Sequence, residues 1–158
     1  MTLRNIGVSI LITLCLARPA TPAARAASEP LLLVVGLAFP VTDVSLTDVK
    51  SVFRGRVVTL GGRRLIPINH PPGTGMREAF DLTVLGLRPA EVSRFWVDQR
   101  IRDAGRPPTS VPTPEMAIRV AATLPGAITY GSKDMLNPKV KILTVDGKLP
   151  GTAGYPLQ

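Results

Sequence analysis

The sequence has few of the side chains that most often carry out catalysis or bind transition metals. Its 158 residues include one cysteine, Cys15, and one histidine, His70. A zinc-type site draws several ligands from these residue types, and a serine or cysteine nucleophile usually relies on a histidine base held beside it. Because the sequence shows no such grouping, we expect no metal site, no cofactor and no enzymatic activity.

Aromatic residues are also scarce, at 4% of the chain, whereas basic residues are abundant. The formal net charge is +8, from 19 Lys and Arg against 11 Asp and Glu. Single-stranded nucleic acid is usually bound by stacking aromatic side chains together with basic ones, so we expect no nucleic-acid partner. A modest positive field suits a small anionic ligand instead.

The sequence has no apolar run long enough to span a bilayer, which takes about 20 helical residues. The apolar stretch at 6–17 follows Arg4 and precedes Ala24-Arg25-Ala26, a small-residue motif typical of signal-peptide cleavage. We therefore predict a secretory signal peptide at 1–27, a periplasmic or secreted mature chain, and no stable membrane insertion after cleavage. Cys15 lies within this segment, so the mature chain would contain no disulfide.

Short apolar runs alternate with amphipathic segments along the remaining chain. The run at 31–36 ends in glycine and predicts a buried strand, and Gly61-Gly62 divides 57–69 into a hairpin. Further strands are expected at 126–132 and 140–145, and helices at 45–55, 75–86, 89–101 and 114–123. This alternation predicts an α/β fold in one domain at 28–147, followed by a flexible Gly- and Pro-rich tail at 148–158.

The helix expected at 89–101 begins at Pro89, which suits the first helical turn. Val92, Phe95, Trp96 and Gln99 share one face at helical spacing. We expect this face to point inward, with Phe95 and Trp96 in the hydrophobic core.

Three stretches of the sequence carry a resemblance when taken in order: SLTDVKSVFRGRV (45–57), PPGTGMREAF (71–80) and ATLPGAITYGSK (122–133). Together they resemble the phosphate-type substrate-binding proteins of ABC transporters, which carry an LS…L…IF.G segment, a GSGTRE.F loop-helix and a PGAIGYV strand. The resemblance implies an α/β fold of the type 2 periplasmic-binding-protein-like class, a single compact domain with a small mixed sheet flanked by helices. It also implies oxyanion binding at helix N-termini and an ABC transporter permease as a partner.

The sequence departs from that family at several positions. Full-length members have two lobes, about twice the length of one domain, and carry a second Gly- and Ser-rich phosphate loop that is missing here. Thr74 stands where the family usually has serine, and Met76 where it has threonine or arginine. The segment 69–71 replaces an Arg or Asp that often lies upstream. In these respects the chain resembles the short, single-domain members of the family.

The loop and first helical turn at 73–77 form the main candidate site. The first N–H groups of a helix lack intrahelical acceptors and carry partial positive charge. Glycines would let an oxyanion approach the backbone, a threonine hydroxyl could donate, and an arginine could bind phosphate or sulfate through two N–H groups. We assign to this site Gly73, Thr74, Gly75, Met76 and Arg77.

Each of these residues also has a simpler interpretation. Thr74 could be only an N-cap, with Arg77 and Glu78 on the solvated face of the helix. Because an arginine is unfavourable beside the positive end of a helix dipole, we expect Arg77 to have a partner, either Asp81 four residues on or a bound anion.

His70 and Tyr130 are further candidates for ligand contact. Charged His70 could donate to an anion, and its pKa would then rise. Tyr130 follows the PGAIxY motif, where the resemblance brings the chain back toward the ligand cleft. The simpler interpretation of each is a packing residue.

Two functions are consistent with the sequence. The first is an exported binding protein for phosphate or a similar oxyanion that supplies an ABC importer. The alternative is a ligand-free, single-lobe accessory protein that keeps the fold and acts through a partner or a homodimer. The Gly-Thr-Gly loop and Arg77 favour the first, whereas Met76 and the missing second loop favour the alternative.

Overall fold

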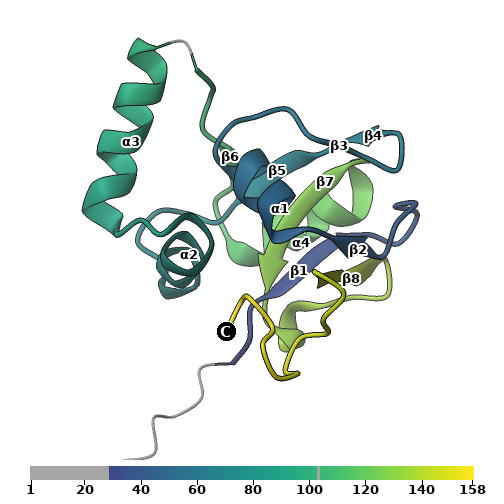
Figure 1. The fold of residues 1–158 in the computed structure, drawn as a ribbon. Coiled ribbons are helices and arrows are strands. Elements are labelled where there is room, and N and C mark those ends of the chain that lie inside the picture. Colours follow the sequence, from purple (N-terminus) through teal and green to yellow (C-terminus); the bar gives the residue numbers. More distant parts are fainter. Residues whose placement is uncertain (1–28, 103) are drawn as a thin grey trace, which may run out of the picture.

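A six-stranded mixed sheet forms the centre of the fold (Figure 1), with strand order β2-β8-β1-β7-β5-β6. The structure is a computed structural model that describes residues 29–102 and 104–158, so the predicted signal peptide with Cys15 lies outside the described residues. The sheet consists of β1 (Leu32–Gly36), β2 (Asp43–Val44), β5 (Ile66–Asn69), β6 (Thr109–Ser110), β7 (Ala127–Gly131) and β8 (Val140–Val145).

The helices are distributed around this sheet. They are α1 (Leu46–Phe53), α2 (Gly75–Phe80), the π-helical turn η1 (Asp81–Leu85), α3 (Pro89–Ile101), α4 (Pro114–Thr123) and the 3-10 turn η2 (Lys133–Met135). Figure 1 shows α1 and α4 on opposite faces of the sheet, with α2 and α3 beyond its edge. In the described part of the chain, no helix is both long enough and apolar enough to cross a membrane.

The central strand β1 shows why the sequence folds into this layered arrangement. It pairs antiparallel with both β7 and β8, and its alternate residues point to opposite faces. Leu33 and Val35 join the core cluster that contains α1, whereas Val34 packs with Ile118 of α4. Because helices cover both faces, the strand is apolar throughout. The predicted α/β fold with a small mixed sheet flanked by helices is confirmed.

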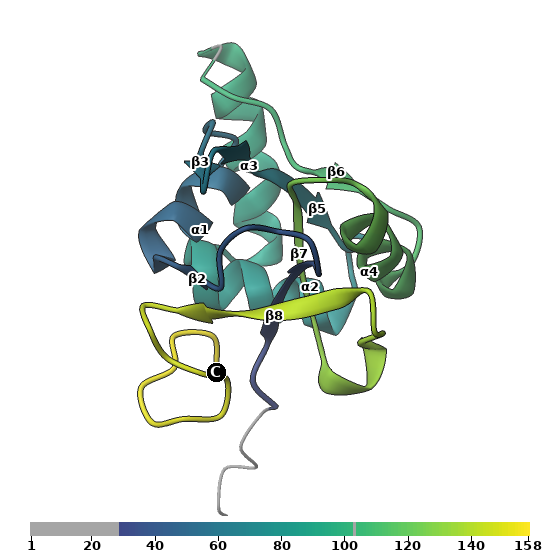
Figure 2. The same cartoon turned by 90° about the vertical axis from the view of Figure 1, so that its right-hand side faces the viewer.

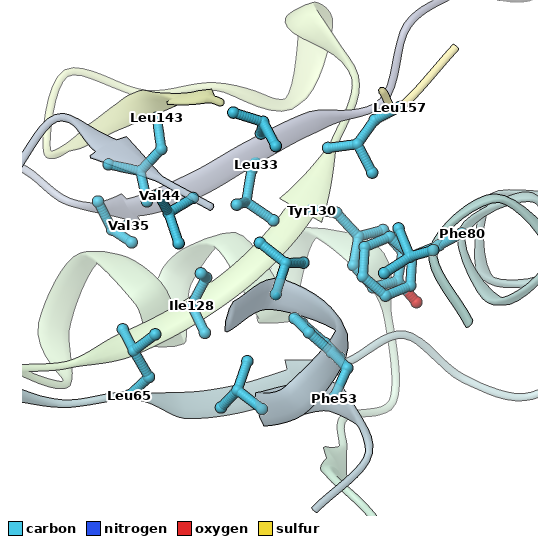
Figure 3. Packing of buried hydrophobic residues seen from close by; sticks show 14 of the residues in the cluster. Leu33, Val35, Val44, Phe53, Leu65, Phe80, Ile128, Tyr130, Leu143 and Leu157 are labelled. Carbon is cyan, nitrogen blue, oxygen red and sulfur yellow. The ribbon is translucent and has the colours of Figure 1, made fainter. Parts of the chain in front are cut away.

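The main core lies between the sheet and α1 and extends to α2, as Figure 3 shows. Phe53, Phe80 and Tyr130 are fully buried there. The rings of Phe80 and Tyr130 are stacked, with centroids 3.8 Å apart and an interplanar angle of 5°. This ring stacking packs the end of α2, the helix that follows the Gly-Thr-Gly loop, against strand β7 of the sheet.

The C-terminal segment 148–158 differs from the flexible tail that its Gly and Pro content predicted. It folds back beside β8 (Figure 2), and Tyr155 and Leu157 are 2% and 0% exposed. Leu31 N donates to the Leu157 carbonyl at 2.8 Å, and the Tyr155 hydroxyl donates to the Leu31 carbonyl at 2.9 Å. The buried side chains of Tyr155 and Leu157 therefore hold this irregular segment against the core.

The hairpin predicted around Gly61-Gly62 is present as β3 (Thr59–Leu60) and β4 (Arg63–Arg64). Both turn glycines have positive φ, 57° and 75°, which suits the tight turns that join antiparallel strands. The following strand, β5, leaves the hairpin and pairs in parallel with β6 and β7. Strand β5 ends at Asn69, and three residues separate it from the Gly-Thr-Gly loop.

Helix α3 has the predicted bounds but not the predicted environment. Val92, Phe95, Trp96 and Gln99 are half-buried, and the remaining residues of α3 are exposed. The placement of Phe95 and Trp96 in the core was therefore wrong. The sequence correctly identified which face of α3 points inward. Because α3 lies beside α2 and away from the sheet (Figure 1), the side chains on that face are only half-buried.

Candidate functional site

The Gly-Thr-Gly loop forms a turn between β5 and α2 in which the threonine does not cap the helix. The Thr74 hydroxyl donates to the Pro71 carbonyl at 3.0 Å, and no side-chain acceptor from the described residues caps α2 at this position. The first N–H groups of α2 therefore lack the acceptor that an N-cap side chain usually provides. The N-cap interpretation of Thr74 does not hold for its side chain.

The two glycines leave the backbone of this loop accessible. Gly73 has a φ of +81°, a conformation that glycine adopts without steric cost. A Cβ built at Gly73 or Gly75 would meet no heavy atom of the described residues within 4 Å. Met76 is half-buried and packs against the main core, so its side chain anchors the turn. Met76 thus fixes the loop against the core, while the backbone at Gly73 and Gly75 remains accessible.

Arg77 is held in place by two contacts. Its Nε donates to Asp81 Oδ2 at 2.6 Å, and its Nη1 donates to the His70 carbonyl at 3.0 Å. Arg77 is only 8% exposed, so it does not lie on a solvated helix face. Of the two partners that the sequence allowed, Asp81 is the one in contact. The guanidinium has further N–H groups that could still donate to an anion.

Asp81 is the second charged group of this cluster. It is 4% exposed, and its Oδ1 has no hydrogen-bond partner within the described part of the chain. Burial raises the pKa of Asp81, while the hydrogen bond and the charge of Arg77 oppose that shift. Asp81 Oδ2 therefore accepts the hydrogen bond of Arg77, whereas Asp81 Oδ1 has an unused capacity to accept one.

His70 and Tyr130 lie beneath the loop. Both are fully buried, and their rings are stacked with centroids 4.3 Å apart. The Tyr130 hydroxyl donates to Asn69 Oδ1 at 2.6 Å. Burial lowers the pKa of His70 from 6.5 to about 4, so the imidazole is neutral near pH 7. His70 and Tyr130 therefore pack in the core next to the loop and are not exposed on the side where the backbone of Gly73 and Gly75 is accessible.

A cavity of about 410 Å³ lies beside the loop, between α2–η1, α3 and the connector that precedes β6. The structure brings Gly73 and Arg77 together at one wall of this cavity and places Trp96 at another. Trp96 Nε1 is buried and has no hydrogen-bond partner among residues 29–102 and 104–158. The charged residues that line the cavity are Arg77, Glu78, Asp81 and Arg100.

Sequence reasoning identified these cavity residues only in part. The i,i+4 spacing of Arg77 and Asp81 indicated their pairing, but Asp81 was not assigned to the site. Trp96 was assigned to the core because helical spacing shows which face of a helix is apolar, not how closely that face approaches the sheet.

Comparison with solved structures finds proteins of the same fold. An ABC-type phosphate transport receptor from Vibrio cholerae has a TM-score of 0.63 and 20% identity, over 77% of this chain and 48% of that protein. A phosphate ABC transporter substrate-binding protein with bound phosphate from Clostridium perfringens gives 0.62 and 18%, over 77% and 47%. PstS from Borrelia burgdorferi gives 0.59 and 16%, over 77% and 49%.

No family model matches the sequence, and no curated protein matches it. The chain spans about half the length of each structural neighbour. At such low identity the likeness is one of fold, and it agrees with the three motifs in the sequence. The chain therefore has the type 2 periplasmic-binding-protein-like fold of the substrate-binding proteins of phosphate ABC transporters.

Proposed function

We propose that this chain is an exported binding protein for phosphate or a similar oxyanion and supplies an ABC importer. The observation that carries the proposal is Arg77, held by Asp81 and the His70 carbonyl beside the open backbone of Gly73 and Gly75. The phosphate-transport neighbours support this choice of ligand. The predicted signal peptide supports a periplasmic or secreted location.

The proposed contacts follow from the geometry of the loop. The uncapped N–H groups at the start of α2 favour negative charge because of the helix dipole. The Thr74 hydroxyl already donates to Pro71, so we assign anion contact to the backbone of Gly73, Gly75 and Met76. Asp81 offsets the charge of Arg77, so Arg77 contributes its remaining N–H donors, and a guanidinium that is already held in place loses less side-chain entropy on binding.

A second protein surface would complete this site. In the described residues the loop is open on one side, and a bound anion there would keep part of its hydration. We propose that the transporter permease or a second copy of this chain covers it. The alternative of a ligand-free accessory protein would use the same surface without an anion.

The test is calorimetry of the mature chain with phosphate, sulfate and other oxyanions. We expect saturable binding of phosphate, and we expect Gly75→Val to weaken it by about tenfold or more because the new side chain occupies the approach to the backbone. Arg77→Ala is less informative, since it would also leave Asp81 buried without a counter-charge.

Thr47→Val is the matched control, because Thr47 is an exposed residue of the first turn of α1. It should bind phosphate as the wild type does. If no anion produces heat or a shift in Tm at millimolar concentration, the proposal is wrong and the ligand-free alternative is favoured.

A further inference from the structure

Four exposed arginines line two adjoining hollows on the surface of the protein, beside the connector between α3 and β6. The first hollow, of about 300 Å³, is lined by Arg56, Arg64 and Arg106. The second, of about 460 Å³, is lined by Arg100 and Arg106. Residues 105–107 line both hollows, so we treat them as one surface, the arginine groove. None of the described residues that line this groove is acidic.

The lack of counter-charge follows from the sequence of the segments that form the groove. Residues 49–77 include six basic side chains and no Asp or Glu, and residues 104–114 also contain no Asp or Glu. Within the described part of the chain, the one ion pair joins Arg77 to Asp81, so no carboxylate there pairs with a groove arginine. Because gathered like charges repel one another, an acidic partner would relieve this repulsion.

Other exposed arginines of the protein lie on surfaces of mixed charge. On α3, Arg94 is three residues after Glu91 and four residues before Asp98. On α4, Arg119 is four residues after Glu115. Side chains at these spacings are neighbours on a helix, so both arginines have acidic neighbours of their own. The groove arginines differ from them in this respect.

The backbone of the groove is fixed where two segments far apart in the sequence meet. Gly55, which follows α1, has a φ of +82°, and a Cβ there would lie 2.6 Å from the carbonyl oxygen of Arg106. Only glycine permits this close approach. Arg56 N donates to the Ser51 carbonyl at 3.0 Å, and Arg64 belongs to β4. The backbone therefore holds three arginines around one hollow, while their side chains remain exposed.

The first hollow also offers accessible apolar surface. Ile66 and Pro67 are half-buried and Pro107 is exposed, and all three line this hollow. A wholly ionic polymer such as polyphosphate gains nothing from apolar contacts, whereas a peptide can carry carboxylates and apolar side chains together. A guanidinium binds a carboxylate through two parallel hydrogen bonds, and arginine is enriched at protein–protein interfaces. The groove therefore suits an acidic protein segment better than a polyanion.

We infer that the arginine groove is a docking site for an acidic segment of a partner protein. Glu or Asp side chains of that segment pair with Arg56, Arg64 and Arg106, and its apolar side chains contact Pro67 and Pro107. Complementary charge of this kind speeds association and selects the partner. The groove contains none of residues 73–77, so this inference goes beyond the proposed function and does not depend on it.

The test is the fluorescence anisotropy of a short labelled peptide in which glutamates alternate with leucines, titrated with the mature chain. We expect saturable binding that weakens as salt is added. The double variant Arg56→Gln/Arg106→Gln should weaken binding by about tenfold or more, because two charge-assisted contacts are lost. A peptide with glutamine in place of glutamate should bind at least about tenfold more weakly.

The matched control is the double variant Arg94→Gln/Arg119→Gln. It removes the same two charges from exposed positions outside the groove. Its affinity for the glutamate peptide should stay within about twofold of the wild type. Both double variants replace exposed side chains, so we expect each to keep a Tm near that of the wild type.

Four outcomes would overturn the inference. Equal weakening by both double variants would show that binding reports only net charge. Absence of peptide binding at millimolar protein, or equal binding of the glutamine peptide, would exclude an acidic docking segment. Polyphosphate of the same net charge is the remaining comparison. If it binds more tightly than the glutamate peptide and loses affinity in Arg56→Gln/Arg106→Gln, the groove binds a polyanion and not a protein segment.

Discussion

At the residue scale, the buried His70 shows how a polar side chain can serve the fold. Its ring stacks on Tyr130, and neither ring nitrogen has a partner among the described residues. Such an imidazole is tolerated only while it is neutral, because a buried charge without a partner is strongly unfavourable. The sequence identified His70 as a ligand candidate by its type and position, but only the structure shows its burial.

We predict that His70 makes the protein less stable in mild acid. Burial lowers its pKa from 6.5 to about 4, so below pH 6.5 the unfolded chain binds a proton that the folded chain does not. Stability is therefore fully present above about pH 6.5 and is lost as the pH falls toward 4. Urea unfolding at pH 7 and pH 4.5 should show a loss of roughly 2 kcal/mol from this residue.

The comparison that isolates this effect is His70→Phe, which keeps the stacked ring and removes the titrating group. This variant should lose less stability than the wild type between the two pH values. Asp81 titrates in both proteins, so its contribution cancels in the difference. Equal losses in the two proteins would contradict the role assigned to His70.

At the scale of elements, the sequence predicts one helix at 75–86 after the loop. The structure divides it into α2 and the π-helical turn η1, which ends at Gly86 with a φ of +68°. Phe80 and Val84 are both buried. The widened turn could not be predicted because π-helical turns depend on local packing rather than on a residue pattern.

We predict that Gly86→Ala destabilises the protein by about 1 kcal/mol, because an L-residue is strained at this left-handed helix end. A Cβ at Gly86 would meet no heavy atom of the described residues within 4 Å, so the cost is conformational rather than steric. Urea unfolding measures the change. Gly75→Ala has no positive φ to maintain and should be neutral or slightly stabilising; equal destabilisation by both would refute this explanation.

At the scale of the whole molecule, the C-terminal segment closes the core at the edge of the sheet. Leu157 is fully buried, and its carbonyl accepts from Leu31 N, directly before β1. Glycine and proline content predicted a flexible tail because these residues disfavour helices and strands. Irregular backbone can nevertheless be ordered when a few of its side chains are buried.

We predict that Leu157→Ala destabilises the protein by about 2–5 kcal/mol, through lost burial and the cavity left behind. Thermal or urea unfolding of the mature chain measures this change. Leu149→Ala, at a leucine of the same segment that is 60% exposed, should change stability by less than about 0.5 kcal/mol. A similar, small effect of both substitutions would show that the segment does not contribute to the core.

The sequence alone determined the alternation of strands and helices, their approximate bounds, and the motifs shared with phosphate-type binding proteins. These are local properties, set by the spacing of apolar residues and by glycines at turns. The tertiary structure alone decided that His70 and Tyr130 are buried behind the loop and that Trp96 lines a cavity. Those outcomes depend on distances between segments far apart in the chain, which no local pattern contains.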